Sequence, residues 1–283
     1  MALTISTNIS SMMAQSNLEN TNKSLNKSIQ RLSSGSIINS AEDNPAGLAI
    51  SEKLRAHIAG LSTAKRNAGD GIAALQVAEG GMAEISNILV RLRELSIQAA
   101  NGTLSNSDRT YLNTEFRQLV SEVDRIAKNT NFNGLTLLSG AFSSSGLILQ
   151  IGLNNTSNDL MTININNIGA DALGSVGEKV LSSITISESA GTARNMLKYL
   201  DKAINDINEA RATIGAQLSR LNAVVRNIST YHQNLSDANS RIRDVDVASE
   251  TANLTKYQIL IQAGVSVLST ANNNPQVALG LIS

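Results

Sequence analysis

Residues 54–89 read LRAHIAGLSTAKRNAGDGIAALQVAEGGMAEISNIL. Within this stretch an apolar residue recurs every seven positions, at Leu54, Leu61, Ala68, Leu75, Met82 and Leu89. A seven-residue apolar repeat is typical of helices that pack along a seam. The pattern predicts one long helix from about Pro45, which suits a first turn, to about Ala100. Within it, Gly69, Gly71, Gly80 and Gly81 mark places for bends or close packing.

A second helical arm is predicted later in the chain. Apolar residues follow one another at spacings of three and four from Leu197 to Leu235, with Arg211 and His232 in two of the gaps. Beyond this arm the seven-residue repeat returns at Val247, Leu254, Ile261 and Leu268. We expect the helix to stop at 272–275, which contains a proline.

The middle of the chain combines a shorter helix with a strand pair. Ser105 to Ser107 can cap a helix whose apolar face runs from Leu112 to Ile126, and 129–134 breaks the pattern. Alternation in 149–153 and 161–165, around a polar turn at 154–159, predicts a two-stranded ribbon. Residues 169–190 are predicted to be loop with short strand pieces. The fold class is therefore mainly α: a long antiparallel bundle with a short β-hairpin in the middle.

The two arms suggest a discontinuous domain organisation. An arm that leads out and an arm that returns bring both termini to the same end. We expect an inner terminal domain from 1–44 and 236–283 and an outer helical domain from 45–142 and 190–235. The hairpin and loop segment, 143–189, belongs to the outer domain.

Both ends of the chain are almost without charge. Residues 257–283 contain no ionised side chain, and the first 22 residues contain only Glu19. The tail is too often interrupted by polar residues to span a membrane, yet a helix in water normally carries a charged face. We expect these ends to be disordered in the monomer and helical in an assembly of copies. The predicted assembly seam consists of Leu25, Ile29, Leu32, Val247, Leu254, Ile261, Val265 and Leu268.

Composition excludes several other roles. With 23 basic and 23 acidic residues, the formal net charge is zero, which gives no electrostatic reason to bind nucleic acid or an anionic membrane. The chain has no cysteine, so disulfides and thiolate chemistry are excluded. The first basic residue is Lys23 and no apolar run follows Met1, so we expect export by a route that reads no such secretory signal.

No arrangement of residues predicts catalysis, a metal or a cofactor. His57 and His232 are isolated in helical runs, and Gly69-Asp70-Gly71 lacks the lysine of a phosphate loop. Asp244 and Asp246 have calcium-loop spacing at two positions only. A cluster of charges on the first long helix, Arg91, Arg93 and Glu94, indicates a solvated or interfacial face. We expect a protein that is not an enzyme.

Several strings resemble the signatures of bacterial flagellin. They are Arg31-Leu32-Ser33-Ser34-Gly35, Asp43-Asn44-Pro45-Ala46-Gly47-Leu48-Ala49-Ile50, Arg91 to Asn101, Phe132-Asn133-Gly134, Ser240 to Asp246 and Gln258 to Leu268. The resemblance covers about 1–140 and 190–283. It departs from the family pattern at Ile37, where arginine is common, and at Asn44, where a second aspartate is common. The chain is similar to a minimal flagellin with almost no outer insertion.

The resemblance implies a function and a set of partners. The family polymerises into the helical filament used for swimming, and its subunits are exported unfolded through the flagellar type III apparatus to the cell exterior. An export chaperone holds the carboxyl-terminal helix, and the filament cap and hook-junction proteins are further partners. A Toll-like receptor contacts positions that match Arg91, Leu95 and Glu115, although a subunit–subunit role for these residues carries more weight.

Three alternatives remain at this point. A hook–filament junction protein shares similar termini. A soluble coiled-coil scaffold would have charged ends, which this chain lacks. A flagellin-like metalloprotease needs a His-Glu-x-x-His helix, which the sequence does not contain.

Overall fold

The computed structural model describes residues 7–175 and 180–280, without the side chains of 274–280. The chain divides into two compact units. The terminal unit comprises Met1–Ile58 and Gln233–Ser283, and the central unit comprises Ala59–His232. Two long helices, α2 (Pro45–Ala99) and α4 (Ala190–Arg243), contribute residues to both units.

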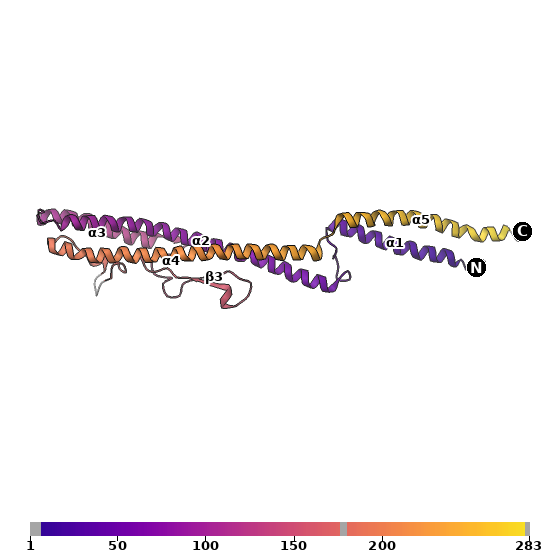
Figure 1. The fold of residues 1–283 in the computed structure, drawn as a ribbon, viewed down its shortest axis with the longest axis horizontal. Helices are drawn as coiled ribbons and strands as arrows, with labels where there is room; N and C mark the ends of the chain where they lie inside the picture. The colour runs from indigo at the N-terminus through magenta and orange to yellow at the C-terminus, as the bar shows by residue number, and fades with distance from the viewer. Residues whose placement is uncertain (1–6, 176–179, 281–283) are drawn as a thin grey trace. The chain divides into compact units, whose positions relative to one another are not determined.

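The terminal unit contains the first and last helices of the chain. Helix α1 spans Ile9–Ser34 and helix α5 spans Val247–Gly280, and the two lie side by side (Figure 1). Asn8 caps α1 by accepting a hydrogen bond from the Ser11 N–H, and Gly35 ends it in the left-handed conformation that glycine adopts without strain. The described parts of both near-uncharged ends are therefore helical in this structure.

The central unit is built on α2, α3 (Asn106–Asn129) and α4, together with two small hairpins. Ser105 and Asp108 form a capping box at the start of α3. The first hairpin pairs β1 (Asn131–Phe132) with β2 (Leu135–Thr136), and the second pairs β3 (Leu147–Gln150) with β4 (Leu160–Ile163). Short 3₁₀ turns lie at Ser157–Asp159 and Leu181–Ser183.

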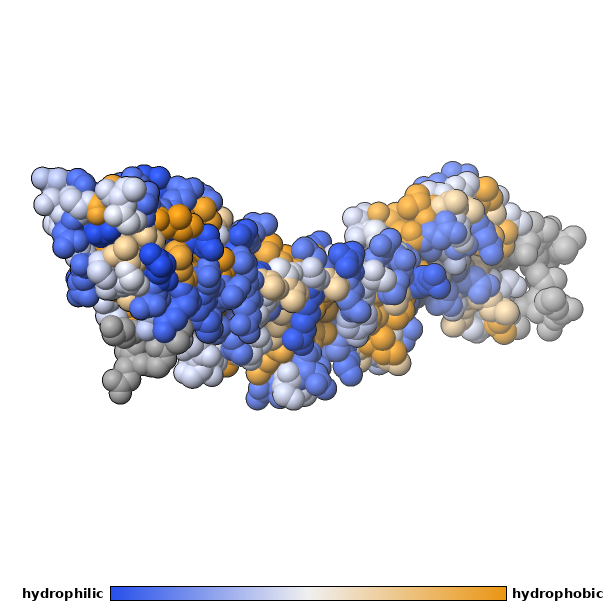
Figure 2. Space-filling view, turned by 60° about the vertical axis from the view of Figure 1, so that its left-hand side comes forward, coloured by the Kyte–Doolittle hydropathy of each residue, from blue (hydrophilic) through white to orange (hydrophobic). Residues whose placement is uncertain are grey.

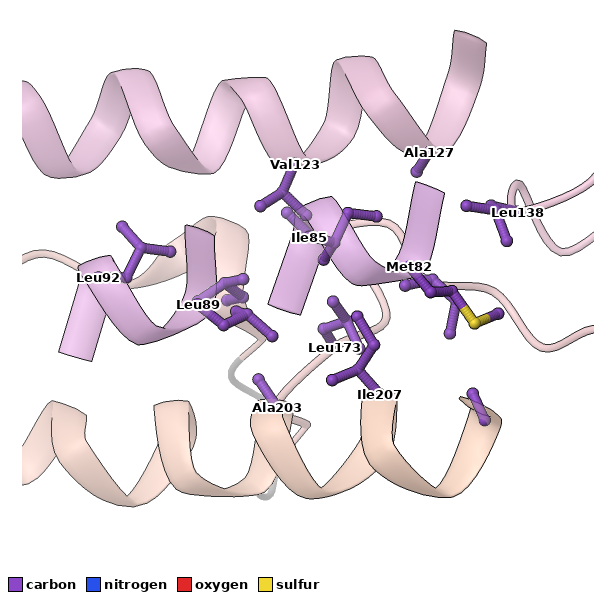
Figure 3. Packing of buried hydrophobic residues seen from close by; sticks show 14 of the residues in the cluster. Met82, Ile85, Leu89, Leu92, Val123, Ala127, Leu138, Leu173, Ala203 and Ile207 are labelled. Carbon is purple, nitrogen blue, oxygen red and sulfur yellow. The ribbon is translucent and has the colours of Figure 1, made fainter. Parts of the chain in front are cut away.

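The core of the central unit lies between the three helices. Figure 3 shows Met82, Ile85, Leu89 and Leu92 of α2 between Val123 and Ala127 of α3 and Ala203 and Ile207 of α4. The seven-residue repeats explain this packing. Five of the six predicted seam residues of α2 are buried, as are members of the α4 repeat at Leu200, Ile207, Ile214, Leu221 and Ile228. Arg211, in a gap of that repeat, pairs with Glu79 at 2.8 Å.

The mainly α fold with a short hairpin is confirmed, and several local predictions need correction. Helix α5 does not stop at 272–275 but continues to Gly280, since an internal proline removes one helical hydrogen bond rather than all of them. No strand is present in the described part of 169–190, and 176–179 lies outside the described residues. The β1–β2 hairpin was not predicted, because two-residue strands carry no alternation. The ribbon at 147–163 is confirmed, starting two residues earlier than expected.

Of the four α2 glycines singled out above, two lie where another part of the chain approaches closely. A Cβ on Gly71 would overlap Leu149 of β3, and a Cβ on Gly81 would lie 2.7 Å from the Thr130 hydroxyl oxygen. The positions of Gly69 and Gly80 are open. Close packing is thus the role of Gly71 and Gly81, and α2 continues as one helix through all four.

This contrast predicts opposite effects of the same substitution two residues apart. Gly69→Ala should stabilise the central unit by about 0.5–1 kcal/mol, because alanine is the better helix former. Gly71→Ala should lose that gain and destabilise the unit by about 1–3 kcal/mol, because Leu149 must be displaced. Urea denaturation of the two variants measures the difference, and equal stability would show that the hairpin moves away from α2 without cost.

Candidate assembly surface of the terminal helices

Helices α1 and α5 form an antiparallel pair that is tied at both ends. At one end, the Asn8 side-chain amide donates to the Ala271 carbonyl at 2.7 Å, and the Ser11 hydroxyl donates to Oδ1 of Asn272 at 2.6 Å. At the other end, Arg31 lies 3.7 Å from Glu250, whose side chain is 9% exposed. These contacts fix the register of the two helices.

A seven-residue repeat lines the seam between the two helices. On α1 the inward positions are Ser11, Ala14, Leu18, Thr21, Leu25, Ser28 and Leu32; on α5 they are Glu250, Leu254, Tyr257, Ile261, Gly264, Leu268 and Ala271. Such spacing is the pattern of a coiled coil. However, the α1 side is mostly small or polar, so the seam buries little apolar area. The contact holds the helices in register but supplies a weak core.

The predicted assembly residues divide between this seam and the opposite faces of the helices. Leu25, Leu32, Leu254, Ile261 and Leu268 are half-buried in the seam. Ile29, Val247 and Val265 are exposed, with exposed fractions of 45%, 59% and 53%. The eight residues therefore do not form one surface. Sequence periodicity identified the shared repeat but could not tell an inward from an outward position, because both kinds of position are apolar here.

The outward faces of the pair carry a large number of exposed apolar side chains. Figure 2 shows apolar residues gathered on the terminal helices, next to the grey ends of the chain. We define this outward apolar face by Ile9, Met12, Met13, Ile29, Val247, Ile259, Leu260, Val265 and Val267, all of them exposed. Soluble monomers rarely expose apolar residues so densely, and such surfaces mark contact sites.

The two units differ sharply in what they bury. Among the described residues of the terminal unit, the buried hydrophobic side chains are Ile38 and Ala271 only. The central unit buries a continuous cluster that extends from Ala68 to Leu221. Because burial of apolar surface is the main driving force of folding, the terminal helices have little to hold them in place alone.

A groove runs along one side of the pair. It has a volume of about 250 Å³ and is lined by Leu18 and Thr21 of α1 and by Leu260, Gly264 and Val267 of α5, among others. Gly264 makes room for it, since a Cβ at this position would lie 3.2 Å from Leu18. The groove adds to the apolar surface that the pair leaves uncovered.

The connections at the base of the pair are held by charges and backbone bonds. Ile37 donates its N–H to the Arg243 carbonyl at 2.6 Å, and Lys27 lies 2.6 Å from the Asp43 carboxylate. The Lys27 hydrogen bond, with a further one from the Asn39 N–H, holds the pKa of Asp43 well below its ordinary value. Sequence reasoning missed this ion pair, because its two residues lie on separate segments and no local pattern joins them.

Asp246, considered above for its calcium-loop spacing, lies at the start of α5. Its Oδ1 accepts hydrogen bonds from the N–H groups of Ala248 and Ser249 at 3.0 and 3.3 Å. An aspartate that accepts from the first free N–H groups of a helix is a normal N-cap. Helix capping therefore accounts for this residue.

The residues matched to the immune-receptor contact lie in the central unit. Arg91 bonds Glu115 through Nε and Nη2 at 3.1 and 2.9 Å, and it also bonds Glu94. Arg91 and Glu115 are about half exposed, whereas Leu95 is 0% exposed. Leu95 thus packs in the core of the central unit in this conformation, and the receptor match at this position stays a prediction. Arg93 pairs instead with Asp201 at 2.8 Å.

Comparisons with known proteins now identify the family. The model of the bacterial flagellin N-terminal helical region matches residues 5–143, and the model of the C-terminal helical region matches residues 197–282. The chain belongs to the bacterial flagellin family. Its two matched regions contain α1 to α3 and most of α4 and α5, so the family regions include both halves of the terminal pair.

Relatives of this flagellin match it from end to end. The flagellar filament 33 kDa core protein of Treponema phagedenis is 41% identical, with 98% of this chain and 99% of the relative covered. Flagellin FlaB2 of Treponema pallidum is likewise 41% identical over the same shares. Among solved structures, a putative flagellar hook-associated protein from Vibrio parahaemolyticus is 17% identical, with a TM-score of 0.62. The match covers 71% of this chain and all of that structure's chain. That likeness concerns the fold alone.

None of the described helices has the length and apolar content to cross a membrane. Within the same residues, no group of three or more histidine, aspartate or glutamate side chains is placed to hold a metal ion.

Proposed function

We propose that the paired terminal helices are the polymerisation module of this flagellin, a structural subunit of the bacterial flagellar filament. The outward apolar face is covered by neighbouring copies in the filament, and the pair is fully ordered only there. The observation that carries the proposal is the contrast in burial: among its described side chains the pair of long helices buries one hydrophobic residue, Ala271, whereas the central unit has a continuous core.

Charge supports the same proposal. From Tyr257 onward the chain has no ionised side chain, so close packing of several copies around α5 brings no unpaired charge out of water. The ionised groups of the pair are concentrated toward its other end, where Lys27 and Arg31 already have partners at Asp43 and Glu250. The uncharged stretch of α5 from Tyr257 onward suits packing against identical copies.

The proposal includes the domain division and the partners expected from the family. Residues 1–44 with 236–283 form the inner domain of the filament, and 45–142 with 190–235 form the outer domain, to which 143–189 belongs. The subunit leaves the cell through the flagellar export apparatus, with a chaperone on its carboxyl-terminal helix, and meets the cap and hook-junction proteins outside. Receptor recognition would use the exposed Arg91 and Glu115.

Limited proteolysis of the purified monomer tests the order of the terminal helices. We expect a protease to remove most of α1 and α5 and to leave the central unit intact, because helices with few buried contacts open at low free-energy cost. The same protease should leave both helices uncut in assembled filaments. Terminal helices that resist cleavage equally in both states would contradict the proposal.

A hook–filament junction role is the second candidate, and the comparisons weigh against it. The hook-associated structure shares the fold at 17% identity, whereas filament proteins share 41% of residues over nearly the full chain.

A further inference from the structure

The connection between α2 and α3 contains the dipeptide Asn101-Gly102. We propose that Asn101 is a site of spontaneous deamidation, and that the folded central unit accelerates the reaction there. The proposal concerns the chemistry of this connection and is independent of how the terminal helices assemble.

The reaction requires only water. The Gly102 backbone nitrogen loses its proton to solvent and attacks Cγ of the Asn101 side-chain amide. A new C–N bond forms, the Cγ–Nδ2 bond breaks, and ammonia leaves after taking up a proton, which gives a five-membered succinimide. Water then adds to one of the two ring carbonyls and opens the ring to aspartate or isoaspartate. The sum is amide plus water to carboxylate plus ammonium.

Arg109 is placed to activate the attacking nitrogen. Its Nη2 donates to the Asn101 main-chain carbonyl at 2.9 Å, and this carbonyl belongs to the same peptide group as the Gly102 nitrogen. When that nitrogen is deprotonated, the negative charge is shared with the carbonyl oxygen. A guanidinium hydrogen-bonded to the oxygen stabilises the anion and so favours its formation.

The guanidinium is held firmly in this position. Arg109 is 6% exposed, and it also donates through Nε to the Ala99 carbonyl at 2.9 Å and through Nη1 to Oδ1 of Asn106 at 2.9 Å. It therefore closes the carboxyl end of α2 against the start of α3. The bonds to Ala99 and Asn101 join the helices, and the bond to Asn106 within α3 helps to keep the charge of Arg109 beside the reactive peptide group.

The side-chain amide of Asn101 is polarised by a second donor. The Thr103 N–H bonds Oδ1 of Asn101 at 3.2 Å. Negative charge develops on this oxygen as the Gly102 nitrogen adds to Cγ, so the N–H acts as a fixed oxyanion donor. The turn that this bond closes also folds the side chain back over the following peptide, toward the attacking nitrogen.

Solvent reaches the dipeptide. Asn101 and Gly102 are both exposed, and apart from the two chain neighbours no heavy atom lies within 4 Å of the position that a Cβ on Gly102 would take. Each event adds one negative charge to a chain whose formal net charge is zero, so the isoelectric point falls below the present value of about 6.8.

Asn133-Gly134 provides a control within the same molecule. It is also exposed, but it forms the two-residue turn between Phe132 and Leu135, with φ of 50° and 80°. Paired strands on both sides hold this turn. Among the described residues, no side chain donates to the Asn133 carbonyl and no donor reaches its amide oxygen. Both asparagines precede glycine, so in the unfolded chain they should react at similar rates.

The experiment compares the two sites in the intact chain. Purified protein is incubated in mildly alkaline buffer, folded and in denaturant, and peptide mapping by mass spectrometry follows the rise of about one dalton at each asparagine. We expect Asn101 to react at least about tenfold faster than Asn133 in the folded protein, and the two rates to converge in denaturant. A folded-state ratio no larger than the denatured-state ratio overturns the proposal.

Variants separate activation by the Thr103 N–H from mere exposure. Thr103→Pro removes the oxyanion donor and leaves Arg109 in place, and it should slow the reaction at Asn101 by about tenfold without changing Asn133. Gly102→Ala should slow Asn101 further through steric hindrance. Circular dichroism confirms that each variant folds. If Thr103→Pro folds and reacts at the original rate, the activation argued here is refuted.

Discussion

Deletion of 257–283 is expected to abolish filament formation completely while the central unit still folds. The deletion removes the seam partners of the first half of α1, because Ile261, Gly264, Leu268 and Ala271 face Ser11 to Leu25. The core of the central unit ends at Leu221 and loses no member. Negative-stain microscopy and sedimentation measure assembly, and thermal unfolding by circular dichroism measures the central unit.

A scrambled tail is the matched control for this deletion. Rearranging the residues of 257–283 keeps length, composition and zero charge but destroys the seven-residue spacing that places Ile261 and Leu268 against α1. We expect no filaments from the scrambled chain, because the register of the pair is lost. Normal filaments from the deleted chain would refute the proposal that the terminal pair is the polymerisation module. If the scrambled chain forms filaments and the deleted chain does not, any apolar tail is sufficient for assembly.

Much of the fold could be predicted from apolar spacing. The seven-residue repeats that include Leu75 in α2 and Ile207 in α4 are strong signals, because one face of each long helix is buried along most of its length. The capped start of α3 was visible for the same kind of reason, since Ser105 and Asp108 bond each other across three residues. Local chemistry determined these features, so a local pattern was enough to predict them.

The candidate surface was harder to predict because it depends on contacts between distant parts of the chain. Val265 and Leu268 differ little in chemistry, yet one faces outward and the other inward. Leu95 matched a receptor-contact position in the family pattern, but the helices around it enclose it completely. The pairing of Glu250 with Arg31 joins residues far apart in sequence. In each case the role of the residue depends on which distant residue it contacts, and the local sequence does not indicate that contact.

Val265→Asp is expected to block polymerisation while leaving the α1–α5 pair no less stable. Val265 is 53% exposed at the edge of the seam on α5, so a carboxylate there stays hydrated in the monomer. If neighbouring copies cover the outward apolar face, the same carboxylate is buried without a partner in every subunit, at a cost of several kcal/mol. A cost of about 3 kcal/mol raises the critical concentration for assembly by about a hundredfold.

Two comparison variants make this result specific. Val265→Thr keeps the shape without the charge and should shift the critical concentration far less than the aspartate does. Ile261→Asp places its carboxylate in the seam between α1 and α5. It should also stop assembly, but it should do so by separating the two helices. Limited proteolysis under filament-forming conditions detects this separation as faster cleavage. Sedimentation across a concentration series gives the critical concentration of each variant. Val265 and Ile261 are both β-branched aliphatic residues, one turn apart on α5, the first exposed and the second half-buried in the seam. Unchanged assembly by Val265→Asp would therefore mean that the outward apolar face remains in water and that copies meet elsewhere.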